Sequence, residues 1–447
     1  MTASLVLAGC DGDAGPSPEP TPDAPVSKAR LTFGVWGTED ELASYESMVE
    51  QFNETSETSR VVVEPYPDRD ALAAALTDED ERPDVFLASR SELAWLREEN
   101  LNVPVDELLD ERGVAFGDRY SRAALEAFSA DRRLQCMPYG ISPMVMFYNT
   151  ELVDFDRMAE RGLDVPTEER TRWTFDQFEE AARFATRKRR GIKGVHVDPT
   201  LRSLAPFIYS GGGSLFNDAE DPTSLTLADD DSREALARTL EVLRDPTVTL
   251  SEEQLARRTP LEWFERGRVG MIEGYRSMVP RLRSVPGLEF DVIAMPILDS
   301  AATTGDITGT CIAEGAENIP AAADFLVHAL SSEAVSEVAR AGYLVPANQD
   351  VALTDDFLQP GREPEHASVF TSSVAAMRIP PLIDVWTELD AAVEPTLEEM
   401  FTVPVLDDLE EITTRIDEIS RTVLDPPDPT DAPSDGSSDD SSDDAEE

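Results

Sequence analysis

The sequence predicts a protein of the α/β class, built around doubly wound sheets. From residue 31 onward, apolar strand-like runs alternate with amphipathic helix-like segments, which is the order typical of sheets with helices on both faces. The chain has 447 residues, enough to form two domains with separate cores. It contains no run of about 18 apolar residues, so the sequence predicts no membrane-spanning helix.

The N-terminal part of the α/β region predicts its elements most clearly. Thr38 is placed to cap a helix whose third residue is Glu41, and apolar residues follow at helical spacing. In doubly wound sheets, ligands bind beyond the carboxyl ends of the strands, so residues 36–39 and 88–90 are expected at the mouth of a site. The predicted elements are a strand at 31–36, a helix that opens at Thr38, a strand at 60–64, a helix at 70–76 and a strand at 83–87.

The alternation of strands and helices continues to residue 424. From Asp425 the composition changes to Pro, Ser, Asp and Glu, which predicts a disordered acidic tail over 425–447. The predicted elements of this part are a long strand at 136–149, helices at 174–187, 232–243, 319–330, 332–341 and 386–400, a helix ending on the glycines at 211–213, a helix-to-strand segment at 264–274 and a strand at 290–296.

Acidic residues dominate the composition. The formal net charge is −52, which excludes a general nucleic-acid binder because phosphate is repelled by such a surface. Most of these carboxylates are expected on solvated faces, and a cationic ligand is the alternative interpretation. The histidines His196, His328 and His366 are isolated in the sequence, so we expect no metal site and no cofactor.

The N-terminal residues resemble a bacterial lipoprotein signal. Small residues precede Cys10, and in the lipobox that they resemble a signal peptidase cuts before a cysteine that then carries acyl chains. Residues 11–27 hold five prolines and no Lys or Arg, which predicts an extended tether beyond the lipidated cysteine. No Lys or Arg precedes Cys10, so residues 1–9 are expected to be a truncated signal.

Short motifs further along the chain carry a second resemblance. Each motif is weak by itself, but their order is specific. In chain order they are Pro83-Asp84-Val85, Pro138-Tyr139 with Tyr148-Asn149, Gly212-Gly213-Ser214-Leu215-Phe216, Phe264 with Gly267 and Met271, Pro296, Asn318 with Ala321, Ala322 and Phe325, and Gly342 with Pro346 and Ala347. Over residues 31–424 this order resembles family 1 of the extracytoplasmic solute-binding proteins of ABC importers, the group that includes maltose-binding protein.

The resemblance implies a two-lobed, type II-like periplasmic-binding-protein fold. Each lobe is a sheet flanked by helices, and hinge strands join the lobes around a ligand cleft. Lobe one is expected at 28–147 and 307–424, including the C-terminal helices, and lobe two at 148–306. The implied function is to bind a small solute, here a carbohydrate, and to deliver it to ABC permease subunits by cleft closure. Together with the lipoprotein signal, this resemblance leads us to expect an extracytoplasmic, lipid-anchored monomer.

The sequence carries no catalytic motif. It has no Gly-x-Ser-x-Gly, no His-Glu-x-x-His and no Cys-x-x-Cys, so we expect no enzyme activity. Two alternatives remain open, a lipid-anchored surface enzyme that acts on glycans and a sensor that reports a solute to a membrane kinase.

The resemblance also implies where the ligand is held. Aromatic faces with a few directed polar groups are typical of small-molecule sites. Cys136 and Cys311 are implied at the hinge strands, where we expect two separate buried thiols, with a disulfide as the alternative. The residues predicted to bind the ligand are Trp36, Glu39, Ser89, Arg90, Ser142, Tyr275, Arg276, Asp306 and Trp386.

Overall fold

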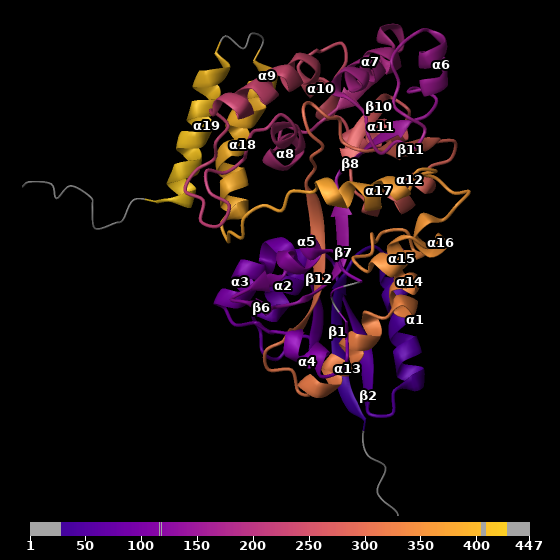
Figure 1. The fold of residues 1–447 in the computed structure, drawn as a ribbon, viewed down its shortest axis with the longest axis vertical. Coiled ribbons are helices and arrows are strands. Elements are labelled where there is room, and N and C mark those ends of the chain that lie inside the picture. Colours follow the sequence, from indigo (N-terminus) through magenta and orange to yellow (C-terminus); the bar gives the residue numbers. More distant parts are fainter. Residues whose placement is uncertain (1–27, 116, 118, 404–407, 427–447) are drawn as a thin grey trace, which may run out of the picture.

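The protein folds into two α/β lobes, one above the other in Figure 1. The computed structural model describes residues 28–115, 117, 119–403 and 408–426. The predicted signal at 1–9, Cys10, the tether at 11–27 and the acidic tail beyond residue 426 lie outside the described residues. Within the described residues, no helix is both long enough and apolar enough to span a bilayer.

Lobe one is built on a six-stranded sheet. Strand β1 runs parallel to β2 and β3, whereas β12 runs antiparallel to β3, β4 and β7. The sheet order is β2-β1-β3-β12-β4, with β7 also paired to β12. The strands are β1 (Ala29–Trp36), β2 (Ser59–Tyr66), β3 (Val85–Ser89), β4 (Asn102–Val103), β7 (Met137–Pro143) and β12 (Gly305–Ala313). The strands predicted at 31–36, 60–64 and 83–87 are therefore confirmed.

Helices and a small hairpin complete lobe one. The helices are α1 (Glu39–Thr55), α2 (Arg69–Leu76), α3 (Leu93–Glu98), α4 (Asp106–Asp110), α5 (Arg122–Ala127), α13 (Ile319–Ala329), α14 (Ser332–Ala339), α15 (Gln349–Ala352) and α16 (Asp355–Leu358). The hairpin pairs β5 (Ser129–Ala130) with β6 (Arg133–Leu134).

The start of lobe one shows how sequence determines local structure. Leu31, Phe33 and Val35 alternate along β1 and are buried, as the two-residue period of a strand requires. The Thr38 hydroxyl then accepts the backbone N–H of Glu41 at 3.4 Å, which caps α1. The strand therefore ends at Trp36, and this residue lies at the carboxyl edge of the sheet.

Lobe two is built on a four-stranded sheet with the order β11-β8-β10-β9. Along β8, Val145 and Phe147 join the core that extends from lobe one, whereas Met146 and Tyr148 join a second core on the opposite face. The strands are β8 (Val145–Asn149), β9 (Lys193–His196), β10 (Val269–Gly274) and β11 (Phe290–Ile293). The helices are α6 (Phe155–Glu160), α7 (Phe175–Ala185), α8 (Leu201–Ser210), α9 (Asp230–Leu243), α10 (Glu252–Leu255), α11 (Pro260–Glu265) and α12 (Val279–Arg283).

The chain passes between the lobes along β7–β8 and returns along β12 (Figure 1). The single strand predicted at 136–149 is interrupted at Met144, whose backbone N–H donates to the Thr304 carbonyl at 2.8 Å. The two crossings are therefore hydrogen-bonded to each other at the point where β7 gives way to β8.

Cys136 and Cys311 form a disulfide, so the expectation of two separate thiols is wrong. Met137 pairs with Thr310 in the antiparallel β7–β12 ladder. The next residues outward are Cys136, just before β7, and Cys311 on β12, and their Cα atoms lie 4.5 Å apart, within bonding range. Strand register, which the sequence does not reveal, brings the two sulfur atoms together.

The C-terminal helices pack on lobe two, which corrects their assignment to lobe one. They are α18 (Trp386–Thr402) and α19 (Leu409–Leu424), and Figure 1 shows them beside α8 and α9. Helix α17 (Ser368–Ser373) lies instead against the crossing strands β7 and β8, and its Val369 and Phe370 join the core that extends from lobe one. Leu389 and Ile416 are buried in the core of lobe two. The Asp417 carboxylate accepts the backbone N–H groups of Leu227 and Ala228 at 2.8 and 3.0 Å. This irregular segment of lobe two thus obtains from α19 the hydrogen bonds that its own backbone lacks.

Candidate ligand-binding cleft

Two adjoining cavities lie between the lobes, with volumes of about 500 and 350 Å³. Their linings share five residues, so the two cavities lie side by side, and we call them together the cleft. The shared residues are Arg69, Asp70, Ser89, Asp306 and Ile307.

Strand ends contribute several residues of the cleft lining. Trp36 ends β1 and Ser89 ends β3, so both lie at the carboxyl edge of the lobe-one sheet. Tyr275 follows β10 of lobe two. Ser142 on β7 and Asp306 on β12 are directly paired on the crossing strands. The cleft thus lies where ligands bind in open α/β sheets.

Seven of the nine predicted ligand-binding residues line the cleft. They are Trp36, Ser89, Arg90, Ser142, Tyr275, Asp306 and Trp386. The structure brings these side chains together from both lobes, and their role in holding a ligand stays a prediction.

Glu39 does not line the cleft. It is the first residue of α1 and is exposed to solvent. Glu41, two residues later, lies within the lining instead. A helix turns by about 100° per residue, so a shift of two positions changes which face a side chain occupies. Burial raises the pKa of Glu41 to about 7, and the hydrogen bond with the Thr38 backbone offsets part of this rise.

Arg276 also lies outside the cleft and is completely buried. Its Nε donates to the Gly342 carbonyl at 3.1 Å, and its Nη2 donates to the Phe357 carbonyl at 2.9 Å. Only its backbone faces the cleft side, where its N–H donates to the Ser142 hydroxyl at 3.3 Å. Alternation along the chain explains the error, because neighbouring side chains such as Tyr275 and Arg276 point in opposite directions.

Ser89 and Arg90 begin a 3₁₀ turn at the end of β3. The Ser89 hydroxyl accepts the backbone N–H of Ser91, and the Glu92 carboxylate accepts the backbone N–H of Ser89 at 2.6 Å. This capping box aims Arg90 into the cleft, where its Nε is buried without a hydrogen-bond partner among the described residues. Burial lowers the pKa of Arg90 to about 10. The chain thus leaves this nitrogen of Arg90 without an acceptor among the described residues.

An ion pair crosses the cleft. Arg202 on α8 of lobe two contacts the carboxylate of Asp306 on β12. The Tyr275 hydroxyl is buried beside this pair, and burial together with the Asp306 charge raises its pKa to about 12, which the neighbouring Arg202 opposes only in part. The hydroxyl therefore stays protonated and can donate a hydrogen bond.

Aromatic side chains provide apolar faces at both ends of the cleft. Trp36 lines the cavity at the lobe-one end. Trp386 begins α18 and lines the other cavity, where it packs edge-to-face on Phe216 with ring centroids 5.4 Å apart. Flat apolar faces with directed polar groups can bind a ring that carries hydroxyl groups.

Sequence reasoning missed several side chains of the lining. Arg69 and Asp70 begin α2, separated by two residues from the end of β2, so the strand-end rule that placed Trp36 could have found them. No sequence signal identified residues from helices of lobe two and the C-terminal region. The missed residues include Glu41, Arg69, Asp70, Arg202, Tyr209, Tyr343, Asp384 and Asp390. Within the described part of the chain, no group of three or more His, Cys, Asp or Glu could hold a metal ion.

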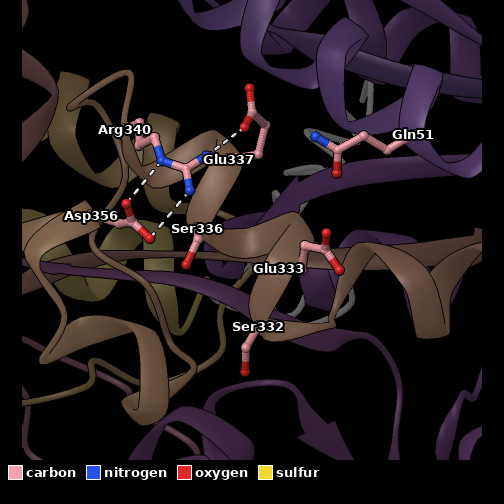
Figure 2. Close-up of a pocket in the computed structure, with 7 residues that line it drawn as sticks. All are labelled: Gln51, Ser332, Glu333, Ser336, Glu337, Arg340 and Asp356. Atoms are coloured by element: carbon pink, nitrogen blue, oxygen red, sulfur yellow. Dashed lines mark hydrogen bonds and ion pairs between the residues drawn. The ribbon is translucent and has the colours of Figure 1, made fainter.

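Another hollow lies on the outside of lobe one, between α1 and α14 (Figure 2). Arg340 at its edge makes ion pairs with Glu337 and Asp356. Figure 2 shows this guanidinium held between the two carboxylates. The charge of the arginine is thus balanced by the chain itself.

The fold and the cleft define a two-lobed binding protein of the periplasmic type. A model of the family described as bacterial extracellular solute-binding protein matches residues 47–363. The chain belongs to this family of extracellular solute-binding proteins.

Solved structures share the fold at low sequence identity. An ABC substrate-binding protein from Listeria monocytogenes, solved with cycloalternan, is 19% identical with a TM-score of 0.74, and the match covers 89% of this chain and 99% of that one. The cyclic α-maltosyl-1,6-maltose binding protein from Arthrobacter globiformis is 18% identical with a TM-score of 0.71 and the same coverage. The GacH receptor of Streptomyces glaucescens, solved unliganded and with acarbose, is 18% identical with a TM-score of 0.70, again with that coverage. No curated protein sequence matches this chain.

Proposed function

We propose that this protein binds a carbohydrate, of oligosaccharide size, outside the cytoplasm and delivers it to an ABC permease. The observation that carries the proposal is the cleft, whose two adjoining cavities combine the aromatic faces of Trp36 and Trp386 with the buried polar groups of Arg90 and Tyr275. Two adjoining cavities accommodate a chain of sugar rings better than a single ring. The fold relatives solved with cycloalternan and acarbose support the same class of ligand.

Binding in the cleft stabilises whichever arrangement of the lobes contacts the sugar from both sides. A hinge at the β7–β8 and β12 crossings needs only a few changes in backbone angle to close the lobes. A permease that recognises the closed arrangement then senses occupancy, because the ligand shifts the population toward it. The protein acts as a monomer by binding alone and leaves the sugar chemically unchanged.

A panel of linear and cyclic oligosaccharides, with amino acids and short peptides as controls, tests the ligand class. A ligand that binds only the folded state raises the unfolding midpoint, and calorimetry then gives its affinity. We expect one oligosaccharide class to bind and to be recovered intact by chromatography. Binding of peptides alone would overturn the carbohydrate assignment, and recovery of a cleaved sugar would favour a glycan-active enzyme.

We also propose that Cys10 is acylated and anchors the protein to the outer face of the membrane. Acyl chains contribute about 0.8 kcal/mol per buried CH₂ group, so two or three chains retain a protein at a bilayer. Cys10→Ser should release the protein into the soluble extracytoplasmic fraction. Membrane retention that is unchanged by this substitution would contradict the anchor.

A further inference from the structure

One carboxylate of the cleft has no positively charged partner. Glu41, on the first turn of α1, lines the cavity of about 500 Å³ and is partly exposed. In the described part of the chain, no ion pair within 4.0 Å involves its side chain. Its carboxylate accepts a hydrogen bond from the backbone of Thr38. An ionised carboxylate has about four acceptor positions, so this bond leaves most of them unused.

The other acids that line this cavity have partners within the chain. Asp68 caps α2 by accepting a backbone N–H of that helix at 2.9 Å. Asp70 lies 3.7 Å from Nε of Arg69. Asp306 contacts Arg202 across the cleft. These three side chains are therefore already engaged, whereas the carboxylate on α1 is not.

The lining of this cavity carries a net negative charge. It holds four acidic side chains and, among the described residues, one basic side chain, Arg69. Arg69 lies 3.7 Å from Asp70 and 3.9 Å from Glu92, so two acids share its charge. Arg90 lines the neighbouring cavity rather than this one. The lining therefore offers no cation that would balance Glu41.

Gly37 brings this carboxylate and an aromatic face together. It connects Trp36, at the end of β1, to the cap of α1, and its φ of +152° suits glycine. A Cβ at Gly37 would lie 2.6 Å from Oε2 of Glu41, so the carboxylate folds back over the residue that follows Trp36. Trp36 and Glu41 thus line the same part of one cavity.

Two further aromatic side chains line this cavity. They are Tyr45, one turn beyond Glu41 on α1, and Tyr343. Burial and then the charge of Glu41 raise the pKa of Tyr45 well above its ordinary value, so its hydroxyl stays protonated. A carboxylate with aromatic faces beside it is suited to an ammonium group, because negative charge and ring quadrupoles both attract a cation.

Burial makes the Glu41 carboxylate costly to ionise when no cation is near. It raises the pKa of Glu41 to about 7, and no basic side chain acts to lower it. A cation bound against the carboxylate favours the ionised form and offsets the cost of desolvation. A neutral hydroxyl does this less well, since hydrogen bonds between two charged groups are stronger.

We propose that Glu41 holds a protonated amino group of the ligand beside Trp36, and that the ligand is a carbohydrate with a basic nitrogen, such as an amino sugar. This ligand class rests on the proposed function, because it concerns the same cleft. An ammonium group suits the negative lining of this cavity, whereas an anionic sugar would be repelled there.

Sugars that differ only in the amino group test the proposal. The probes are glucosamine and its oligomers, their N-acetylated counterparts, and glucose with its oligomers of the same linkage. In calorimetric titrations of the full protein at pH 7, we expect the amines to bind at least about tenfold more tightly than the neutral sugars, because hydrogen bonds between charged groups contribute more. Equal or tighter binding of the neutral sugars would overturn the amine site and leave the carbohydrate function in place.

Glu41→Gln provides the second measurement. Glutamine also caps helices at this position, so the substitution removes the charge and retains an acceptor for the Thr38 backbone. We expect it to weaken amine binding by about tenfold or more and to change the affinity for the N-acetylated sugars much less. Glu39→Gln, on the same turn but outside the cleft, should bind like the original protein. Equal changes for amines and neutral sugars in Glu41→Gln would contradict the proposal.

The pH dependence of binding separates a charge effect from a structural one. The affinity for glucosamine oligomers should rise from pH 5 to pH 7, because Glu41 ionises over this range while the amine stays largely protonated. Tyr45 and Tyr275 stay protonated throughout, since burial raises the pKa of both. Glu92, in the neighbouring cavity, also has a pKa of about 7, so the slope is compared with that of Glu41→Gln.

Glu41→Gln should lose most of this slope while remaining at least as stable as the original protein. An unchanged slope in the variant would overturn the role of Glu41. Binding of a diamine such as putrescine, with no response to any sugar, would instead overturn the carbohydrate function and with it the amino sugar.

Discussion

In lobe one a disulfide links the β7 region to β12, whereas in lobe two the C-terminal helices α18 and α19 complete the core. We call these two features the closures of the lobes. The Cys136–Cys311 disulfide joins β7 to β12 at the lobe-one end of the crossings. In lobe two, α18 and α19 cover one face of the core and Asp417 supplies hydrogen bonds to the backbone. The pairing register of β7 with β12 determines whether the disulfide can form, and contacts between segments distant in the sequence determine where α18 and α19 pack.

The difference teaches how the cleft is built. Its lobe-one wall comes from strand ends close to the N-terminus, such as Trp36 and Ser89. The opposite side needs Arg202 of α8 and Trp386 of α18, which are far apart in sequence. Substitutions at the disulfide, at α19 and in the cleft should therefore affect the free energy of unfolding and the ligand affinity differently. We expect the effects below in order from the largest to the smallest.

Removing the disulfide should have the largest effect. The bond joins residues separated by 175 positions, and the enclosed loop contains all strands of lobe two. The double variant Cys136→Ser with Cys311→Ser should lose about 2–5 kcal/mol in free energy of unfolding, measured with urea. Cys10→Ser serves as the control and should leave the midpoint unchanged. An unchanged midpoint in the double variant would show that the disulfide does not close lobe one.

The next largest effect is a pH dependence from Glu41 at the lobe-one wall. Burial raises its pKa from 4.5 to about 7, so between these values the native state binds more protons than the unfolded state. The Glu41 contribution therefore makes stability fall as pH rises through this window. Glu41→Gln should remove that fall and stabilise the protein at pH 8 by at most about 3 kcal/mol.

The exposed residue Glu39 provides a matched control on the same turn of α1. Thermal unfolding from pH 4 to pH 8 should show the same slope for Glu39→Gln as for the original protein. If Glu41→Gln keeps that slope as well, the carboxylate of Glu41 is not buried as the structure shows.

Asp417 tests the closure of lobe two. Asp417→Ala leaves the N–H groups of Leu227 and Ala228 without their acceptor, which should cost about 1–3 kcal/mol in free energy of unfolding. Glu418→Ala changes an exposed acid on the next position of α19 and should be nearly neutral. Equal effects of the two substitutions would indicate that α19 does not supply hydrogen bonds to lobe two.

Binding energetics test whether both lobes share one ligand. Trp36→Ala should weaken binding of the identified sugar by about 1–3 kcal/mol in calorimetric titration, because it removes an aromatic face from the cleft. The double variant with Tyr275→Ala should show coupling, since both side chains line the same cavity. Trp263→Ala, outside the cleft, should leave the affinity unchanged. Strict additivity of Trp36→Ala and Tyr275→Ala would separate these two residues into different sites.

The smallest effect should come from the C-terminal acidic segment. Helix α19 ends at Leu424, and the helical hydrogen bond at its end uses Asp425. Deleting residues 427–447 should change the free energy of unfolding by less than about 0.5 kcal/mol, as for other surface changes. A large drop in the urea midpoint would show that this segment contributes to the closure of lobe two.

The sequence by itself determined the strands and caps whose signals are local. The alternation of Leu31, Phe33 and Val35 and the cap at Thr38 predicted β1 and α1, because neighbouring residues alone decide these structures. The strand-end rule then placed Trp36 and Ser89 at the cleft. The order of motifs predicted the family, and the matching family model confirms that prediction.

Only the tertiary structure decided which distant segments meet. The sequence could not give the β7–β12 register that joins Cys136 to Cys311, nor the packing of α18 and α19 on lobe two. Sequence reasoning also placed Glu39 and Arg276 in the cleft by mistake. A shift of one or two positions along the chain changes the direction of a side chain, so Glu39 faces solvent and Arg276 lies in the core. Such outcomes depend on the sum of many contacts between segments that are remote in the chain, and no short stretch of residues carries that information.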